Sequence, residues 1–160
     1  NEFEKRFLSG ELYEADSIKV ADSLKFKTKK GRIVYGGGGI IPDVFVPIEK
    51  NHNKEGLELL LQSEIMSYYA FEKLDENRAF FSKMTKSELK KELFKNDKYF
   101  NQFKEYVTSN GLLFNLSDQK EQVLTFLYAE FSKQLFNDTS YYQIVLPRDK
   151  MIKKVLVKQK

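Results

Sequence analysis

A run of four glycines, Gly36 to Gly39, constrains this chain more than any other feature, because glycine loses the most conformational freedom on folding and offers no side chain to pack. A stable domain keeps such a run where the backbone needs a positive φ or passes close to another segment. Residues 32–35 and 44–46 on either side are rich in β-branched and aromatic side chains, which is typical of strands. Pro47 ends the second run, since it has no N–H for a sheet ladder. The sequence therefore predicts two strands separated by a glycine passage and a Pro-Asp corner.

A β-hairpin is expected directly before the glycines. Residues 24–28 alternate as a strand does, and the basic stretch 29–32 has the character of a turn. Pairing of about 23–28 with 32–35 would form the hairpin, and Phe3, Phe7 and Leu8 would lie on one side of a short helix before it. Two strands alone are marginal in water, so we expect the other strands of this sheet to lie outside the chain.

The chain after Pro47 has a different composition and is predicted to be helical. Residues 49–56 are polar and loop-like, which places a domain boundary there. Thr85 and Glu88 form a capping box that begins a helix carrying Leu89 and Leu93. Three further stretches repeat apolar side chains every three or four residues, the pattern of inward helix faces. They are Leu57, Leu61, Ile65, Tyr68, Phe71 and Leu74; Tyr99, Phe100, Phe103, Tyr106 and Val107; and Val123, Leu124, Leu127, Phe131 and Leu135.

Helix boundaries are also marked near the end of the chain. Ser109-Asn110-Gly111 is predicted to stop the second of these helices, with glycine in a left-handed cap. Residues 141–146 fit either a continuing helix or a strand, and Pro147 interrupts whatever precedes it. Residues 150–158 are predicted to form a last basic turn or two of helix. The predicted fold class is α+β, mostly α, with a small N-terminal β-hairpin segment followed by a helical C-terminal domain.

Composition narrows the function classes. Hydrophobic residues make up 41% and charged residues 31% of the 160, with Lys and Glu mixed along the chain, so we expect a soluble globular protein with solvated helix faces. A formal net charge of +4 permits acidic partners without requiring them. Cysteine is absent, which excludes disulfides and thiolate chemistry, and the single histidine, His52, stands in a polar loop. No apolar run reaches membrane-spanning length, so no membrane span is expected.

Several chemical interpretations are less favoured than structural ones. The glycine run lacks the following helix that a phosphate loop needs, and Pro-Asp and a strand are expected there instead. Asp43 has no acidic neighbours and fits a corner residue better than a metal ligand. Basic residues alternate with aromatics over 95–104, as in single-strand nucleic-acid binders, but these aromatics follow a helical stripe and fit core packing. We predict no metal, no cofactor and no nucleic-acid partner.

The segment Gly39-Ile40-Ile41-Pro42-Asp43-Val44-Phe45-Val46-Pro47 resembles the end of the protease domain in the carboxy-terminal processing (tail-specific) serine peptidases, family S41. That family carries a Pro-Asp-hydrophobic-x-Val-Pro signature at this place. Two segments near the start of the chain look like the corresponding sequence in Bacteroidetes-type members of the family. They are Phe3-Glu4-Lys5-Arg6-Phe7-Leu8-Ser9-Gly10-Glu11-Leu12 and Ala15-Asp16-Ser17-Ile18-Lys19. The resemblance covers roughly the first third of the chain, and the pieces 141–142 and 146–149 also look like the family's variable helical C-terminal region.

The resemblance implies that 1–48 is the C-terminal segment of the protease domain and 49–160 an α-helical C-terminal domain. The family uses a serine nucleophile and a lysine base that must be desolvated to accept a proton. In the family, the motifs that contain this serine and this lysine lie upstream of the Pro-Asp segment, and neither motif is present in this chain. Lys30 does not fit the role of the base, because it lies in a basic turn beside Lys29 and Arg32. No catalytic residue is therefore assigned. The chain would be an inactive piece of a longer extracytoplasmic, for example periplasmic, endopeptidase.

Partners follow from the same resemblance. They would be protein or peptide substrates, reached through the parent enzyme, and self-association remains open. The alternative is a non-enzymatic helical interaction or regulatory module in which the Pro-Asp signature is coincidence.

Overall fold

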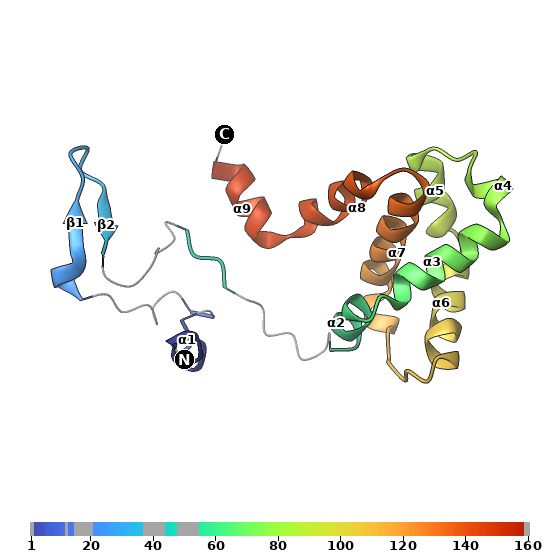
Figure 1. The fold of residues 1–160 in the computed structure, drawn as a ribbon, viewed down its shortest axis with the longest axis horizontal. Coiled ribbons are helices and arrows are strands. Elements are labelled where there is room, and N and C mark those ends of the chain that lie inside the picture. Colours follow the sequence, from blue (N-terminus) through green and yellow to red (C-terminus); the bar gives the residue numbers. More distant parts are fainter. Residues whose placement is uncertain (1, 12, 15–20, 37–43, 48–54, 159–160) are drawn as a thin grey trace. The chain divides into compact units, whose positions relative to one another are not determined.

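A computed structural model describes residues 2–11, 13–14, 21–36, 44–47 and 55–158 of the chain. The chain divides into two compact units, residues 1–50 and 51–160, which are described separately below. Figure 1 shows the first unit with its small sheet and the second with its helices. The predicted class, α+β and mostly α, is confirmed.

The first unit contains a short helix and the expected hairpin. Helix α1 spans Glu2–Leu8, and a 3-10 turn, η2, covers Asp22–Leu24. Strands β1 (Lys25–Lys27) and β2 (Ile33–Tyr35) pair antiparallel, with Lys25 opposite Tyr35 and Phe26 opposite Val34. Gly31 closes the turn with a φ of 82°, which glycine adopts without a steric penalty.

Residues 44–46 do not form the predicted second strand. The described part of this segment, 44–47, is irregular backbone and pairs with neither strand of the hairpin. A β-branched run becomes a strand only where a neighbouring strand satisfies its N–H and C=O groups, and the described residues provide no such neighbour. The prediction of a strand at 44–46 is therefore wrong for this chain.

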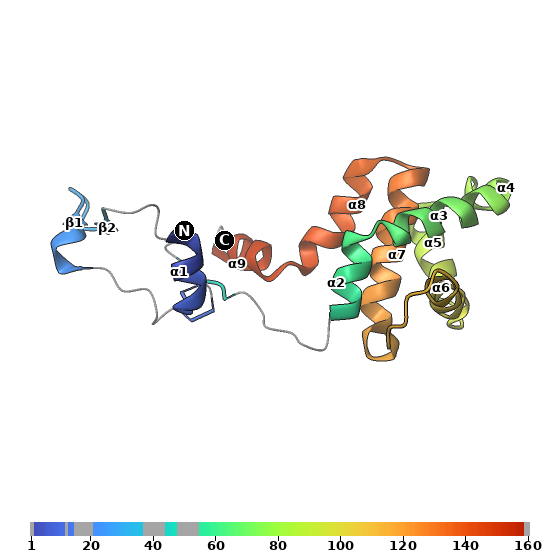
Figure 2. The ribbon, with the colours of Figure 1, turned by 60° about the horizontal axis from the view of Figure 1, so that its bottom comes forward.

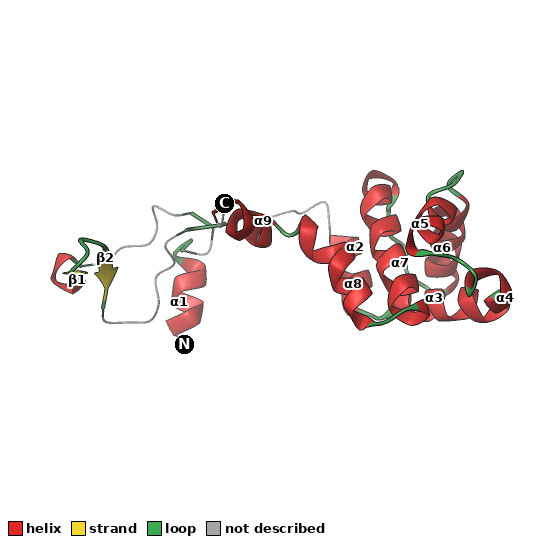
Figure 3. Cartoon of the chain, turned by 90° about the horizontal axis from the view of Figure 1, so that it is seen from above, coloured by secondary structure: helices red, strands yellow, loops and turns green. Residues whose placement is uncertain are grey.

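The second unit is a bundle around α7 (Lys120–Leu135), whose main neighbours are four other helices (Figures 1 and 2). These are α3 (Ile65–Glu76), α5 (Lys86–Leu93), α6 (Lys98–Ser109) and α8 (Asp138–Val145). The other elements are α2 (Glu55–Gln62), α4 (Arg78–Phe81), the 3-10 turns η4 (Ser117–Gln119) and η5 (Leu146–Arg148), and α9 (Lys150–Lys158). Seen from above in Figure 3, helices dominate this unit and loops are short.

Aromatic rings fill the centre of the bundle. Phe131 on α7 is completely buried, and its ring centroid lies 5.5 Å from that of Phe81 and 6.4 Å from those of Tyr69 and Tyr99. Phe103 packs edge-on against Tyr69 at 5.2 Å. Edge-to-face and tilted contacts of this kind add stability beyond the area they bury. The rings come from α3, α4, α6 and α7, so this cluster joins most of the bundle.

The first predicted helical stripe is partly wrong, because two helices stand where one was expected. α2 ends at Gln62, and α3 begins after Glu64, whose φ of 55° is left-handed. Because of this break, a different side of α3 faces the core than a single continuous helix would present. Tyr68 and Phe71 are therefore exposed by 62% and 54%, whereas the buried side chains here are Leu57, Leu60, Ile65, Met66, Tyr69, Ala70 and Leu74. Leu61 is also partly exposed.

The predicted caps are confirmed where local chemistry sets them. Thr85 Oγ1 accepts from Glu88 N, and Glu88 Oε2 accepts from Thr85 N at 2.8 Å, so the capping box is complete. Gly111 follows α6 with a φ of 80°. Residues 141–146 belong neither to a strand nor to a continuation of α7. Residues 141–145 belong to a new helix, α8, which begins at Asp138 because the preceding Asn137 caps it: Asn137 Oδ1 accepts from Ser140 N at 3.0 Å.

Candidate functional site

A cavity of about 490 Å³ lies between α2, α3, α7 and α8 of the second unit. Its wall combines apolar side chains from α2 with Phe126 of α7 and with tyrosines of α8. Three carboxylates, Glu64, Glu130 and Asp138, and one amine, Lys133, also line it. The lining therefore has an excess of negative charge.

Glu130 is the most constrained of these carboxylates. Its side chain is only 14% exposed, and its Oε2 atom is buried without a hydrogen-bond donor. Burial raises the pKa of Glu130, whereas Lys133 and the hydroxyl of Ser67 act in the opposite direction. The Lys133 amine lies 4.0 Å from Oε2 and 5.9 Å from the centroid of the Tyr141 ring. Burial also raises the pKa of Tyr141, with the Glu130 charge adding to it.

This arrangement suits electrostatics better than covalent chemistry. A serine-lysine mechanism needs a desolvated, neutral lysine beside the serine. Lys133 is instead 42% exposed, with the Glu130 carboxylate and the Tyr141 ring as neighbours, so it is not desolvated. Ser67 Oγ lies 3.5 Å from Gln134 Nε2, which also donates to the Ser67 carbonyl at 2.9 Å. The cavity can hold a small polar or cationic group, but no residue in it is placed as an activated nucleophile.

A second, open groove runs along α4 and α5. It has a volume of about 540 Å³, and its apolar lining consists of Ala79, Phe80 and Met84. Phe80 is half exposed, and Lys83, Lys91 and Lys95 stand along the groove. Glu88 and Glu92 also line it, so the groove offers apolar, basic and acidic side chains for contact with another protein.

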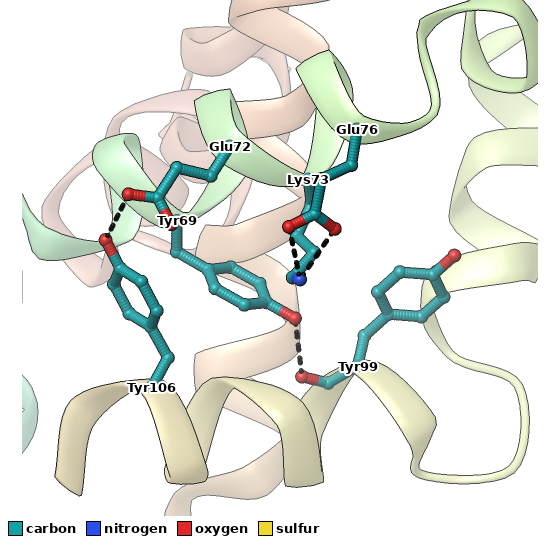
Figure 4. A network of polar contacts seen from close by, with 6 residues as sticks. All are labelled: Tyr69, Glu72, Lys73, Glu76, Tyr99 and Tyr106. Atoms are coloured by element: carbon teal, nitrogen blue, oxygen red, sulfur yellow. Dashed lines mark hydrogen bonds and ion pairs between the residues drawn. The ribbon is translucent and has the colours of Figure 1, made fainter. Parts of the chain in front are cut away.

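A polar network connects α3 to α6 (Figure 4). Tyr106 Oη donates to Glu72 Oε1 at 3.1 Å, and Tyr69 Oη donates to the Tyr99 carbonyl at 3.4 Å. On the face of α3, Lys73 pairs with Glu76 at 2.8 Å. Burial raises the pKa of Tyr69 well above its usual range, so the phenol stays protonated and serves as a donor.

Tyr99 belongs to the same group of buried phenols. Burial, with the nearby Glu92 carboxylate, raises the pKa of Tyr99 to about 12. Tyr99 Oη donates to Glu92 Oε1 at 3.3 Å. Because both phenols remain neutral hydrogen-bond donors, this network holds the helices together and offers no acid-base pair.

The structure places only part of the glycine region. Gly37, Gly38 and Gly39, together with Asp43 and His52, lie outside the described residues. Gly36 continues the hairpin, since its N–H donates to the Leu24 carbonyl at 2.8 Å. A Cβ at Gly36 would lie 2.9 Å from the ring of Phe26, which covers it diagonally across the strands. The absence of a side chain at Gly36 therefore leaves room for the Phe26 ring. Lys30 is exposed in the turn of the hairpin.

The aromatics of 95–104 also lie where core packing requires. Tyr99, Phe100 and Phe103 are buried in the bundle, so their rings cannot stack on bases. Within the part of the chain that the structure describes, no three His, Cys, Asp or Glu side chains gather as a metal site. In the same residues, no helix is both long and apolar enough to cross a membrane.

A family model matches residues 57–137, and the chain belongs to this family of unknown function, DUF8443. The matched range lies within the second unit and runs from α2 to the end of α7. No curated protein and no solved structure matches the chain. The cavity residues on α2, α3 and α7 fall inside the matched range, whereas α8 and α9 follow it.

Proposed function

We propose that this chain is the C-terminal part of an extracytoplasmic serine endopeptidase of the carboxy-terminal processing type, with the catalytic serine and lysine in an upstream part of the same polypeptide. The hairpin carries this proposal. Every residue of β1 and β2 is exposed, including Phe26 at 55% and Ile33 at 55%. A two-stranded sheet with both faces in water lacks the burial that stabilises a sheet, so the pair fits the edge of a larger one.

The two faces of the hairpin suggest how that larger sheet would use it. Phe26 and Val34 are opposite each other on one face, which is entirely apolar. Lys25 and Lys27 share the other face with Ile33 and Tyr35. In the parent enzyme, the Phe26–Val34 face would pack on the protease core. The Pro-Asp signature that resembles the S41 peptidases follows this hairpin directly.

Under this proposal the helical unit is a non-catalytic appendage. Its role would be to assist the enzyme on protein or peptide substrates, because its cavity and groove offer binding surfaces and no activated nucleophile. The chain alone would have no peptidase activity. The full polypeptide encoded at this locus should cleave unstructured peptides with apolar C-termini. Mass spectrometry of the products would measure this cleavage. Cleavage by the isolated chain that disappears in a Ser67→Ala variant would contradict the proposal.

A substitution in the hairpin gives a sharper test. Val34→Asp should leave the thermal melt of the isolated chain unchanged, because that melt reports the helical unit and Val34 belongs to the other unit. The same substitution in the full polypeptide should abolish soluble, active enzyme, because it would put a charge in a packed face. Lys27→Asp, on the opposite face, is the matched control and should be tolerated in both. Full activity of the Val34→Asp polypeptide would show that the hairpin does not pack in the protease sheet.

The second candidate function is a non-enzymatic helical interaction module. The observation in its favour is that the DUF8443 match stays within the helical unit, which has its own aromatic core. This alternative predicts that the full polypeptide lacks peptidase activity while residues 51–160 still fold. The two candidates therefore separate on the activity of the full polypeptide.

A further inference from the structure

The last helix, α9, is strongly amphipathic, and its apolar side is not covered by the bundle. At about 100° per residue, Met151, Ile152, Val155 and Leu156 fall on one side of the helix. We call these four residues the α9 apolar face. Met151, Val155 and Leu156 are 48%, 54% and 55% exposed, and Ile152 is partly buried. The main contact of α9 is with η5, which immediately precedes it.

This helix has its own start signal. Asp149 Oδ1 accepts from the N–H groups of Met151, at 2.7 Å, and Ile152, at 3.0 Å. A carboxylate there satisfies free donors and suits the positive end of the helix dipole. Local chemistry therefore specifies α9, although its apolar face buries little against the rest of the unit.

The segment around α9 carries the positive charge of the protein. Residues 148–160 contain six Lys and Arg and one Asp, a formal net charge of +5. Residues 51–147 contain 12 Lys and Arg and 14 Asp and Glu, a net charge of −2. Lys150, Lys153 and Lys154 fall on the side of the helix away from the α9 apolar face, and Lys158 lies at the edge of that face beside Met151.

We propose that α9 binds the surface of an anionic membrane, with its apolar face in the headgroup region and its lysines against the lipid phosphates. A short helix with aliphatic side chains on one side and lysines on the other is typical of interfacial binding. Lysine suits this position, since its long stem lies along apolar surface while its amine reaches the headgroups.

Charge and composition favour the membrane over other occupants. A second copy of α9 would bring another +5 segment against the first, which costs energy. Protein interfaces are enriched in aromatic residues and Arg and depleted in Lys. α9 contains four lysines, no arginine and no aromatic residue. The inference does not rest on the peptidase proposal, because it uses only α9 and the charge around it.

The test is flotation of the full chain with vesicles of about 30% phosphatidylglycerol in phosphatidylcholine, compared with phosphatidylcholine alone. Binding should require the anionic lipid and should weaken markedly when salt is raised from about 0.1 M to about 0.5 M. Lys153→Gln should reduce the partition coefficient about fivefold, as expected for one charge at such a surface. Leu156→Ser should reduce it about tenfold by removing inserted apolar area.

Two matched controls make the same chemical changes elsewhere. Lys95→Gln removes an exposed lysine from the segment that follows α5, and Leu113→Ser removes a leucine that is 84% exposed. Both should float like the parent chain, and circular dichroism should show that all four variants fold. Equal binding to neutral vesicles, no binding at all, or equal losses in the control variants would overturn the proposal. Retention on a polyaspartate column without flotation would contradict membrane binding and indicate that α9 binds an acidic protein instead.

Discussion

Phe131→Ala should destabilise the helical unit more than an equivalent change at the surface. Phe131 is completely buried, and three aromatic rings lie with centroids 5.5 to 6.4 Å from its own. Replacing a buried phenylalanine by alanine lowers the free energy of unfolding by about 3–5 kcal/mol, because apolar burial is lost and a cavity is left behind. We expect the upper part of this range, because each ring contact adds about 0.5–1.5 kcal/mol.

This loss is large against the total stability of the unit. The 110 residues of 51–160 should have an unfolding free energy of roughly 5–16 kcal/mol. A loss of about 4–5 kcal/mol should lower the melting temperature by about 15–20 °C. Urea unfolding of the full chain, followed by helical circular dichroism, gives the free energy by linear extrapolation.

Phe80→Ala is the matched control for this prediction. It makes the same chemical change, but Phe80 is half exposed and touches the core mainly through Phe81. Its cost should stay below about 1 kcal/mol. A loss at Phe131 no greater than the loss at Phe80 would show that the aromatic cluster is not the centre of stability.

Three further substitutions test local features. Glu130→Gln should raise the melting temperature near pH 8, because burial raises the pKa of Glu130 and penalises its charged form. The gain should shrink as pH falls through the raised pKa of the folded state towards the ordinary glutamate value, and below that value it should be lost, because the parent carboxyl is then neutral in both states. An unchanged gain at acid pH would contradict this reasoning. Thr85→Ala should cost about 1 kcal/mol in urea unfolding by removing the capping box, and no loss would mean that the start of α5 is held by packing alone. Gly36→Val should displace the Phe26 ring, seen as altered Phe26 chemical shifts by NMR, and an unmoved ring would refute the close approach.

The sequence predicted the helical unit well wherever a local signal marked an element. The capping box, the glycine after α6 and the inward stripes of α6 and α7 all occur as expected. These signals succeed because a cap or a stripe acts within one or two turns of the same helix. The prediction was weaker at residues 57–74, where six apolar residues fitted one continuous stripe, and a left-handed Glu64 divides the segment.

The candidate site was not predictable from spacing. Glu130 was not singled out, because a glutamate on α7 looks like any other solvated residue until α3 and α8 bury it. Its only signal in the sequence is its place in the otherwise largely apolar stretch 123–131. The peptidase assignment rests on resemblance and stays a prediction.

The amino-acid sequence by itself determined where α5 begins, where α6 ends, which residues form the hairpin, and that the last helix is basic. Each of these depends on neighbours a few residues apart, so the chain carries the information locally. Tertiary structure decided which apolar side chains are buried, that residues 44–46 are irregular backbone, and that Glu130 lies in a cavity. These outcomes depend on segments far apart in sequence, because burial and strand pairing exist only once another element supplies the opposite surface.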